Sequence, residues 1–380
     1  MLLKCWDMSK FKRLGKYISE CDTRNASNQY GLYSLRGVSI NKEFIESKAN
    51  MEGVSLTPYK LVKPNEFCFV TITSRNGEKI SLAQNTSDET YIVSSSYIVF
   101  RVNDEQELLP DFLYLVLSRP EFDRYARFNS WGSAREAFTF ESMELTEVCI
   151  PSLSEQQKVV NAWKALREIK EQNEAKAAPL MQLCQSYIQE LKHKYPAQEI
   201  GPYIEEYDTR NKDSYYKVED VRGISIEKKI IDTKANMDGV SLSPYKIFKN
   251  GTFCYVTITS RNGDKITLSL NPNDRDYIVS SSYVTFDVKN SDVIIPEFLY
   301  LWFCRSEFDR YARFNSWGSA REAFSFEDMK RTKVPIPPLD VQRAIVNIYK
   351  CANEAKQIAA EADRLSREVC PALLQHVINS

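Results

Sequence analysis

The sequence lacks the motifs that identify common enzyme classes, and it is poor in histidine. It has no GxxxxGK[ST] or GxGxxG loop to hold phosphates and no GxSxG nucleophile motif. With only two histidines, His193 and His376, a His-rich metal site is excluded. Glu78-Lys79 and Asp264-Lys265 lack the spaced carboxylates of a metal-dependent nuclease. These absences indicate a protein that binds and does not itself catalyse.

Cysteine pairing motifs and long apolar runs are also missing. None of the nine cysteines stands in a CxxC spacing, so reduced thiols in a cytoplasmic protein are expected. No apolar run approaches the roughly 20 residues of a membrane span, and no membrane partner is expected. The 50 basic side chains are balanced by 51 acidic ones, whereas nucleic-acid binders are usually basic. A nucleic-acid ligand would therefore need positive charge gathered on one face, or a partner that supplies it.

What the sequence does contain is an internal repeat. The segment EFDRYARFNSWGSAREAF at 121–138 recurs at 307–324, an offset of 186 residues from 121 to 307. The same offset aligns Gly15 with Gly201 without a gap. Each copy is long enough to bury a core. Two similar halves suit a partner that also has two related halves, and double-stranded DNA is the commonest such partner.

Each copy begins with a mixed pattern of strand and helix. Residues 67–73, the turn signal Asn76-Gly77 and residues 79–82 predict a β-hairpin. Residues 91–100 form a further strand candidate. Pro110 is expected to open a helix with one apolar face, and Pro296 does the same in the second copy. The apolar faces comprise Leu113, Val116 and Leu117 in the first copy and Leu299, Trp302 and Phe303 in the second.

Each copy ends in a long helical pattern. Ser154-x-x-Gln157 predicts a capping box for the first helix, and Asp340 is expected to cap the second. Pro179 should kink or break the first helix. Both helices carry apolar stripes, so each can be the partner of the other, although packing back on their own domains is the alternative. An antiparallel pair would place the globular parts at opposite ends of a rod.

The predicted fold is therefore α+β. Two pseudo-two-fold-related domains of mixed helix and strand are expected at 1–153 and 196–339. An antiparallel pair of long helices, 154–195 and 340–380, would join them.

The hairpin tips are the first candidates for DNA binding. Arginine pairs bidentately with guanine and asparagine with adenine in the major groove, which admits a two-stranded ribbon. A solvated turn is the alternative, because Asn-Gly is common in turns for backbone reasons. The candidate residues are Arg75, Asn76 and Lys79 in the first copy and Arg261, Asn262 and Lys265 in the second.

Two further segments of each copy are candidates. The loop 130–135 (SWGSAR) is small and polar and suits close approach to DNA, through Ser133 and Arg135 and the equivalent Ser319 and Arg321. Trp131 and Trp317 could instead anchor the loop in the core. Hydroxyl groups on the strand 91–100 are a weaker signal, from Ser95, Tyr97, Ser281 and Tyr283. Other basic residues are expected on solvated faces, from which they could touch phosphates. They are Arg124, Arg127, Arg310, Arg313, Lys48, Lys60, Lys234 and Lys246.

The start of each long helix carries a resemblance to a known family. Ile150–Gln157 (IPSLSEQQ) follows the GSAR loop and opens the first helix, and Ile336–Arg343 (IPPLDVQR) is a looser second copy. Together with the repeat, these segments resemble the specificity subunit of type I restriction–modification systems over the whole chain. Val341 departs from the family's pattern, which favours glutamate there.

The resemblance implies a division of labour. Each domain would read half of a split target through the major groove, while the helices set the unread gap. Two methyltransferase subunits would dock and use S-adenosylmethionine to methylate adenine. A motor-nuclease subunit would be a further partner where the system also restricts DNA. This chain itself would hold no cofactor and catalyse nothing.

Two close copies predict a near-palindromic, interrupted target. One alternative is the recognition subunit of a two-subunit system that cuts on both sides of its site. Another is a protein-interaction scaffold without a role on DNA.

Overall fold

The computed structural model describes residues 11–47, 49–74, 77, 79–133, 135–260, 263, 265–319 and 321–379. The chain forms two compact units. Unit 1 comprises Met1–Gln172 and Ile358–Ser380, and unit 2 is the continuous segment Asn173–Gln357. Each unit therefore holds one copy of the repeat and parts of both long helices.

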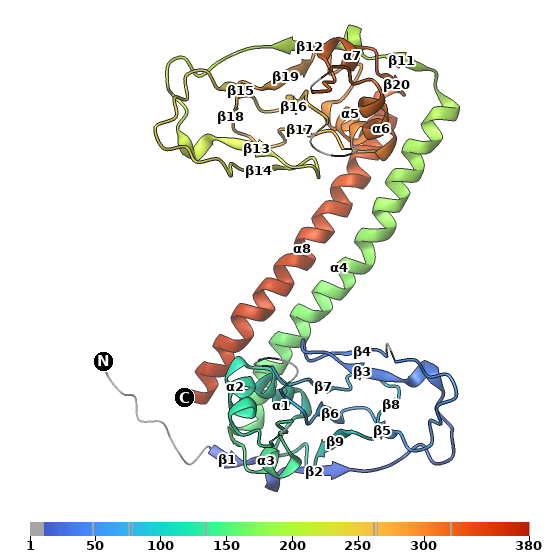
Figure 1. The fold of residues 1–380 in the computed structure, drawn as a ribbon, viewed down its shortest axis with the longest axis vertical. Helices are drawn as coiled ribbons and strands as arrows, with labels where there is room; N and C mark the ends of the chain where they lie inside the picture. Colours follow the sequence, from blue (N-terminus) through green and yellow to red (C-terminus); the bar gives the residue numbers. More distant parts are fainter. Residues whose placement is uncertain are drawn as a thin grey trace. The chain divides into compact units, whose positions relative to one another are not determined.

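Unit 1 is built on a four-stranded antiparallel sheet in the order β2-β9-β6-β7 (Figure 1). Its strands are β2 (Ile18–Cys21), β9 (Tyr97–Val102), β6 (Phe67–Val70) and β7 (Leu82–Gln84). Two-stranded ribbons pair β1 (Phe11–Arg13) with β10 (Glu147–Cys149), β3 (Arg36–Val38) with β4 (Phe44–Glu46), and β5 (Lys60–Val62) with β8 (Tyr91–Val93). The helices are α1 (Pro110–Leu117), α2 (Pro120–Phe128) and α3 (Phe140–Glu144), with 3-10 turns η2 (Leu14–Lys16) and η3 (Leu32–Ser34).

Unit 2 repeats these pairings. Its sheet has the order β12-β19-β16-β17, from β12 (Ile204–Tyr207), β19 (Tyr283–Val288), β16 (Phe253–Val256) and β17 (Leu268–Leu270). Its ribbons pair β11 (Ala197–Glu199) with β20 (Lys333–Pro335), β13 (Arg222–Ile224) with β14 (Ile230–Asp232), and β15 (Lys246–Phe248) with β18 (Tyr277–Val279). Its helices are α5 (Pro296–Phe303), α6 (Ser306–Phe314) and α7 (Phe326–Lys330), with 3-10 turns η4 (Gly201–Tyr203) and η5 (Val218–Asp220).

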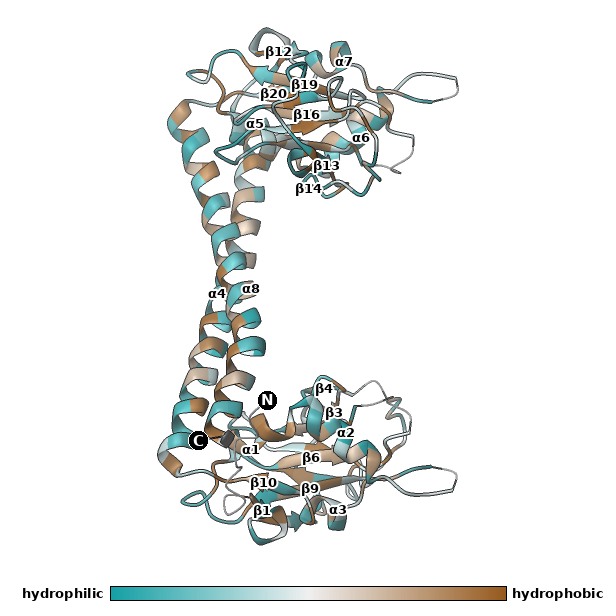
Figure 2. Ribbon diagram, turned by 90° about the vertical axis from the view of Figure 1, so that its left-hand side faces the viewer, coloured by the Kyte–Doolittle hydropathy of each residue, from teal (hydrophilic) through white to brown (hydrophobic). Residues whose placement is uncertain are grey.

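Both faces of each sheet are buried, which explains why the central strand is apolar without interruption. Side chains alternate between faces along a strand. Phe67 and Phe69 join the cluster under α1, α2 and α3, whereas Cys68 packs with Val62 and Val93 of the β5–β8 ribbon. The central strands β6 and β16 are coloured as hydrophobic in Figure 2. The sheet is therefore a rigid internal platform, and function must lie on the segments that leave it.

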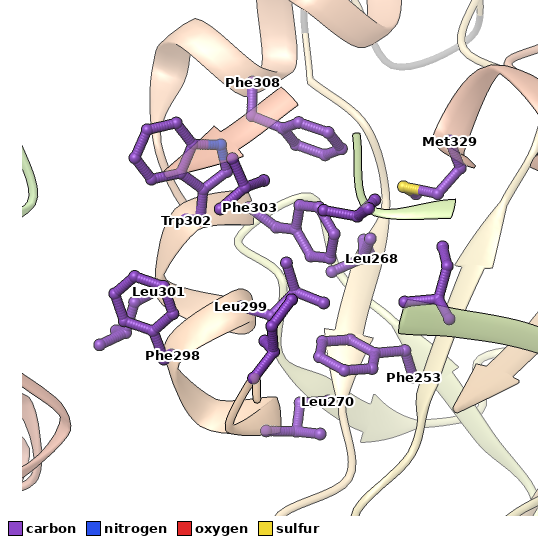
Figure 3. Packing of buried hydrophobic residues seen from close by; sticks show 14 of the residues in the cluster. Phe253, Leu268, Leu270, Phe298, Leu299, Leu301, Trp302, Phe303, Phe308 and Met329 are labelled. Atoms are coloured by element: carbon purple, nitrogen blue, oxygen red, sulfur yellow. The ribbon is translucent and has the colours of Figure 1, made fainter. Parts of the chain in front are cut away.

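The core of unit 2 shows how the short helices are held (Figure 3). Phe253, from the sheet, lies with its ring centroid 5.8 Å from that of Phe303 on α5. The Phe303 ring is in turn 4.6 Å from that of Phe308 on α6. The predicted apolar faces behind Pro110 and Pro296 are buried as expected, and both prolines stand at the first helical turn.

The long helices are α4 (Leu153–Lys194) and α8 (Leu339–Asn379), and they pack together. In unit 1, Val160 near the start of α4 shares a core with Leu374 near the end of α8. Farther along α4, Lys170 Nζ lies 2.9 Å from Asp363 Oδ1, closer to the middle of α8. The pairing in this unit is therefore antiparallel, as predicted.

In unit 2 the end of α4 meets the start of α8. Ile188 and Leu191 share a core with Ile345 and Val346. The Sγ atom of Cys184 lies 3.8 Å from the carbonyl oxygen of Ile345. Each unit thus combines the beginning of one long helix with the end of the other.

The helix starts differ from prediction. Ser152 caps α4: its N–H donates to Glu155 Oε2 at 3.0 Å, and its Oγ accepts the Glu155 N–H at 3.4 Å. The capping box therefore lies two residues before the predicted Ser154. Asp340 does not cap α8, because this helix already begins at Leu339.

Pro179, predicted to kink or break the first helix, does not break it, since α4 continues through the proline. Proline in a helix interior loses one hydrogen bond and costs about 3 kcal/mol. Ala177 and Cys184 on either side of the proline are buried, so tertiary packing contributes to the stability of this part of α4.

A buried glutamine joins each long helix to its unit. Gln156 Oε1 accepts the N–H of Leu109 at 2.9 Å, and its Nε2 donates to the carbonyls of Glu107 and Pro151, both at 2.9 Å. Gln342 makes the equivalent three bonds in unit 2. The motif that opens each helix therefore has a structural role.

Candidate nucleic-acid interface

The predicted hairpin is present, with a longer tip than expected. Strands β6 and β7 pair with Phe69 opposite Leu82, and the Val70 N–H donates to the Ser81 carbonyl at 2.9 Å. The connection between these strands includes Arg75 and Asn76, which lie outside the described residues, as do Arg261 and Asn262 in unit 2. Their assignment to DNA stays a prediction.

The ascending leg of the hairpin is tied to the SWGSAR loop. The Thr73 N–H donates to the Glu136 carbonyl at 3.0 Å, and Thr73 Oγ1 donates to Ser130 Oγ at 2.9 Å. Below this point, the Phe138 N–H donates to the Thr71 carbonyl at 2.8 Å. Unit 2 repeats the contacts at 3.0, 2.8 and 2.8 Å through Thr259, Ser316 and Phe324. Two of the three predicted segments are therefore neighbours in each unit.

The SWGSAR loop is closed by its own backbone. Trp131 and Ala137 exchange two N–H to carbonyl bonds of 3.1 and 3.0 Å. Gly132 has φ +147°, and a Cβ placed there would lie 2.3 Å from the Arg135 carbonyl oxygen. Only glycine fits this turn. The same holds for Gly318 in unit 2, where a Cβ would lie 2.3 Å from the Arg321 carbonyl oxygen.

The loop presents aromatic side chains to solvent. Trp131 and Trp317 are 71% and 67% exposed, so the interpretation of these tryptophans as core anchors is wrong. Phe128 and Phe314, at the ends of α2 and α6, are 79% and 80% exposed and were not predicted. The sequence did hold a signal, because Phe128 falls off the helical face that Phe122 and Ala126 define. Base stacking is one common use of such exposed rings in nucleic-acid binding.

Arg135 and Arg321 are the unpaired cations of the two loops. Both are exposed, and neither forms an ion pair with any described residue. The neighbouring Arg127 is instead held by Glu136, and Arg313 by Glu322. Ser133 and Ser319 are exposed beside them. The free positive charge of each loop therefore resides on a single guanidinium.

The hairpin lysines differ between the units. Lys265 Nζ lies 2.7 Å from Glu227 Oε1, and this hydrogen bond raises the lysine's pKa. Lys79 is exposed and forms no ion pair with the residues that the structure covers. The reason is one substitution between the copies, since Asn41 stands where unit 2 has Glu227.

The serine segment is a turn and not part of one long strand. Strand β8 ends at Val93 and β9 begins at Tyr97, so Ser95 lies in the connecting turn, as Ser281 does in unit 2. Both serines are exposed. Tyr97 is half-buried, and the Tyr283 hydroxyl accepts the Ile224 N–H at 3.3 Å. The expectation of strand-borne hydroxyls is therefore wrong for the serines, which lie in an exposed turn. Tyr97 and Tyr283 do begin strands β9 and β19, as predicted, and they pack on the unit.

A buried ion pair lies at the descending leg of the hairpin, and the sequence analysis missed it. Lys42 Nζ is 2.6 Å from Asp123 Oδ1, and both residues are buried. The same ammonium donates to the Ile80 carbonyl at 3.2 Å, and Asp123 Oδ1 accepts the Ile80 N–H at 3.1 Å. Burial lowers the pKa of Lys42, while Asp123 opposes that shift.

Unit 2 contains the same ion pair. Lys228 Nζ is 2.5 Å from Asp309 Oδ1, and these residues bind the Ile266 carbonyl and N–H at 3.2 and 3.1 Å. Both lysines have positive φ, +64° and +59°. The only sequence signal was the retention of lysine and aspartate in both copies.

Lys60 and Lys246 also differ from expectation. Both are buried rather than solvated, and their ammonium groups lie 3.3 Å from Asp22 and Asp208. Lys234 is exposed, as expected, and Lys48 lies outside the described residues.

No three His, Cys, Asp or Glu side chains among the described residues are placed to hold a metal ion. No disulfide joins any two of the described cysteines. No helix in the described ranges is long and apolar enough to cross a membrane.

Comparisons with known proteins match both copies of the repeat. The family described as "Type I restriction modification DNA specificity domain" matches residues 10–178 and again 192–359. No curated protein matches the chain. Among solved structures, the S subunit of a type I restriction-modification system from M. genitalium is 14% identical over 99% of this chain and 97% of that one, with a TM-score of 0.60. The HsdS subunit from Thermoanaerobacter tengcongensis is 15% identical over 97% and 96% of the two chains, with a TM-score of 0.39. The likeness to the M. genitalium subunit shows a shared fold.

Proposed function

The chain belongs to the family of type I restriction–modification DNA specificity subunits, and on that premise we propose that each unit reads one half of a divided DNA target. The subunit supplies sequence recognition and no chemistry. In each unit, the hairpin tip and the SWGSAR loop enter the major groove, where base edges differ most.

The observation that carries this proposal is the joining of the two loops by Thr73 and Ser130, and by Thr259 and Ser316. These bonds bring an exposed arginine and exposed aromatic rings beside a two-stranded hairpin, the kind of element that the major groove admits. Arg75, Asn76, Arg261 and Asn262 read base edges from the tips. Lys79 and Lys265 contact phosphate, as do the hydroxyls of Ser95, Ser133, Ser281 and Ser319, while Arg135 and Arg321 contact a phosphate or a base edge.

The two half-sites are the same short sequence on opposite strands. The support is chemical identity: residues 121–138 and 307–324 are identical, and so are the hairpin segments 70–77 and 256–263. Identical side chains on identically bonded loops select identical bases. The target is therefore an interrupted palindrome, or nearly one.

Two DNA methyltransferase subunits bind this chain and use S-adenosylmethionine to methylate adenine in each half. The long helices offer apolar contacts for them, since Leu183 on α4 and Val369 on α8 hold equivalent positions and are both exposed. A motor-nuclease subunit completes the complex for restriction.

Binding-site selection with the reconstituted methyltransferase tests the proposal. Random duplexes are bound, separated in the presence of heparin competitor and sequenced. We expect one short motif recovered twice, in inverted orientation, with a fixed gap. Two unrelated half-sites would refute the palindrome, and recovery of no motif would favour a protein scaffold over a DNA reader.

A further inference from the structure

The hairpin tip of each unit is fastened at both ends. The ascending leg is held by the bonds of Thr73 to Ser130 and Glu136. The descending leg is held at Ile80, whose carbonyl and N–H are both bound by the Lys42–Asp123 pair. Between these two points, the described tip residues of unit 1 form no other tertiary hydrogen bond, whereas unit 2 adds the bond from Lys265 to Glu227. The two anchors common to both units therefore hold the legs from which each tip extends.

The ion pair connects several elements at this point. Lys42 comes from the turn between β3 and β4, and Asp123 from α2. The Tyr114 hydroxyl of α1 donates to the Lys42 carbonyl at 3.1 Å, and the Lys42 ammonium lies 5.9 Å from the centre of the Phe122 ring. A shift of the hairpin would therefore break bonds to α2 and to the β3–β4 turn at once, while Tyr114 of α1 holds that turn in place.

Stability alone does not explain a charge pair in this position. Removing two charges from water is unfavourable, and well-packed apolar residues of similar size often serve as well or better. What apolar residues cannot do is bind both polar groups of one peptide residue. Lysine and aspartate together supply the donor and the acceptor that Ile80 needs.

We infer that Lys42 and Asp123 in unit 1, and Lys228 and Asp309 in unit 2, are positioning residues that aim the hairpin tips and thereby determine base discrimination. The inference rests on the proposed reading of DNA by the tips. Neither residue needs to touch DNA, because each acts through Ile80 or Ile266.

The repeat supplies an internal control for the test. In unit 1 alone, Lys42→Met combined with Asp123→Leu replaces the pair by apolar side chains and leaves unit 2 unchanged. Site selection with the reconstituted methyltransferase is then compared with wild type, alongside thermal unfolding of the chain. We expect selected duplexes to keep one intact half-site and one half-site with at least tenfold weaker base preference. The matching Lys228→Met with Asp309→Leu should give the same pattern, and all four changes should relax both halves.

Matched variants separate positioning from folding. Lys60→Met removes another buried lysine, whose ion pairs are with Glu20 and Asp22 and not with the hairpin tip, and it should leave base preference unchanged. Asp123→Asn keeps an acceptor for the Ile80 N–H but removes the charge that holds Lys42, and it should relax one half-site more weakly. If the double variant does not fold, Asp123→Asn alone tests the inference.

The possible outcomes are distinct. Wild-type preference in both halves for Asp123→Asn and the double variant would overturn the inference, as would an equal loss in both halves. If the wild-type complex selects no motif, the proposed function fails instead.

Discussion

The difference between Lys79 and Lys265 leads to a reciprocal prediction. Glu227→Asn gives unit 2 the residue found in unit 1 and releases Lys265 from its 2.7 Å ion pair. Asn41→Glu does the opposite and supplies Lys79 with a carboxylate. If both lysines contact phosphate, the first change should strengthen DNA binding and the second should weaken it.

The size of the effect follows from the exposure of the pair. The side chains of Lys265 and Glu227 are 46% and 64% exposed, so solvent screens the ion pair and the competition with phosphate is modest. We expect about a two- to fivefold change in affinity in each direction at low salt. The salt dependence is the sharper signal, because each added phosphate contact steepens the slope of log affinity against log salt by about 0.9.

The assay is a salt titration of DNA binding by the reconstituted methyltransferase. Glu227→Asn should steepen the slope, and Asn41→Glu should flatten it. Removal of any acidic group could favour DNA, so Glu227→Asn is repeated in a Lys265→Ala background, where the change in slope should vanish. Wild-type slopes for both single variants, or an undiminished effect without Lys265, would refute phosphate contact by these lysines.

Two further predictions concern the loop and the helices. Gly132→Ala should strain the SWGSAR loop by roughly 1–3 kcal/mol, because of its positive φ and the nearby Arg135 carbonyl, and DNA binding should fall about 5- to 150-fold. The control Gly37→Ala should bind as wild type, because a Cβ there meets only a side chain at 3.6 Å. Equal DNA binding by the two variants would contradict this prediction. The hydrogen bond from Lys170 lowers the pKa of Asp363, so this contact stabilises unit 1 above the unfolded pKa of about 3.9 and is lost as pH falls through the lower folded value. Asp363→Asn should therefore be less stable than wild type at pH 6, by less than about 1 kcal/mol, with the difference disappearing towards pH 3 in chemical denaturation; a difference that stays constant with pH would exclude this ionisation as its source.

Local patterns predicted much of the fold. Pro110 and Pro296 open helices whose apolar faces are buried, and the hairpin lies where the Asn-Gly signal placed it. These features depend on residues close together in the chain, which is why they could be read from it. The serine turn was missed because tyrosine and valine on either side of Ser95 favour strands, while the turn is set by pairing of β8 and β9 with different partners.

Long-range contacts account for what could not be predicted. Lys42 and Asp123 are far apart in sequence, and each alone resembles an ordinary surface charge. The exposure of Trp131 depends on the bridge to Ala137 and on the anchoring of that loop to Thr73. Neither property has a local pattern, and only the repetition of these residues in both copies suggested a role.

The composition of the units has a consequence for synthesis on the ribosome. Unit 2 is a continuous segment, whereas the core of unit 1 includes Leu374 and Val377, which are translated after the whole of unit 2. Unit 2, which is encoded second, can therefore complete its folding first. Part of the apolar core of unit 1 stays exposed until Leu374 and Val377 have been synthesised. A chain that ends at residue 357 would contain all of unit 2 but would lack the last segment of unit 1. Unit 1, although encoded first, would then be the unit with an incomplete core and exposed apolar side chains that chaperones bind.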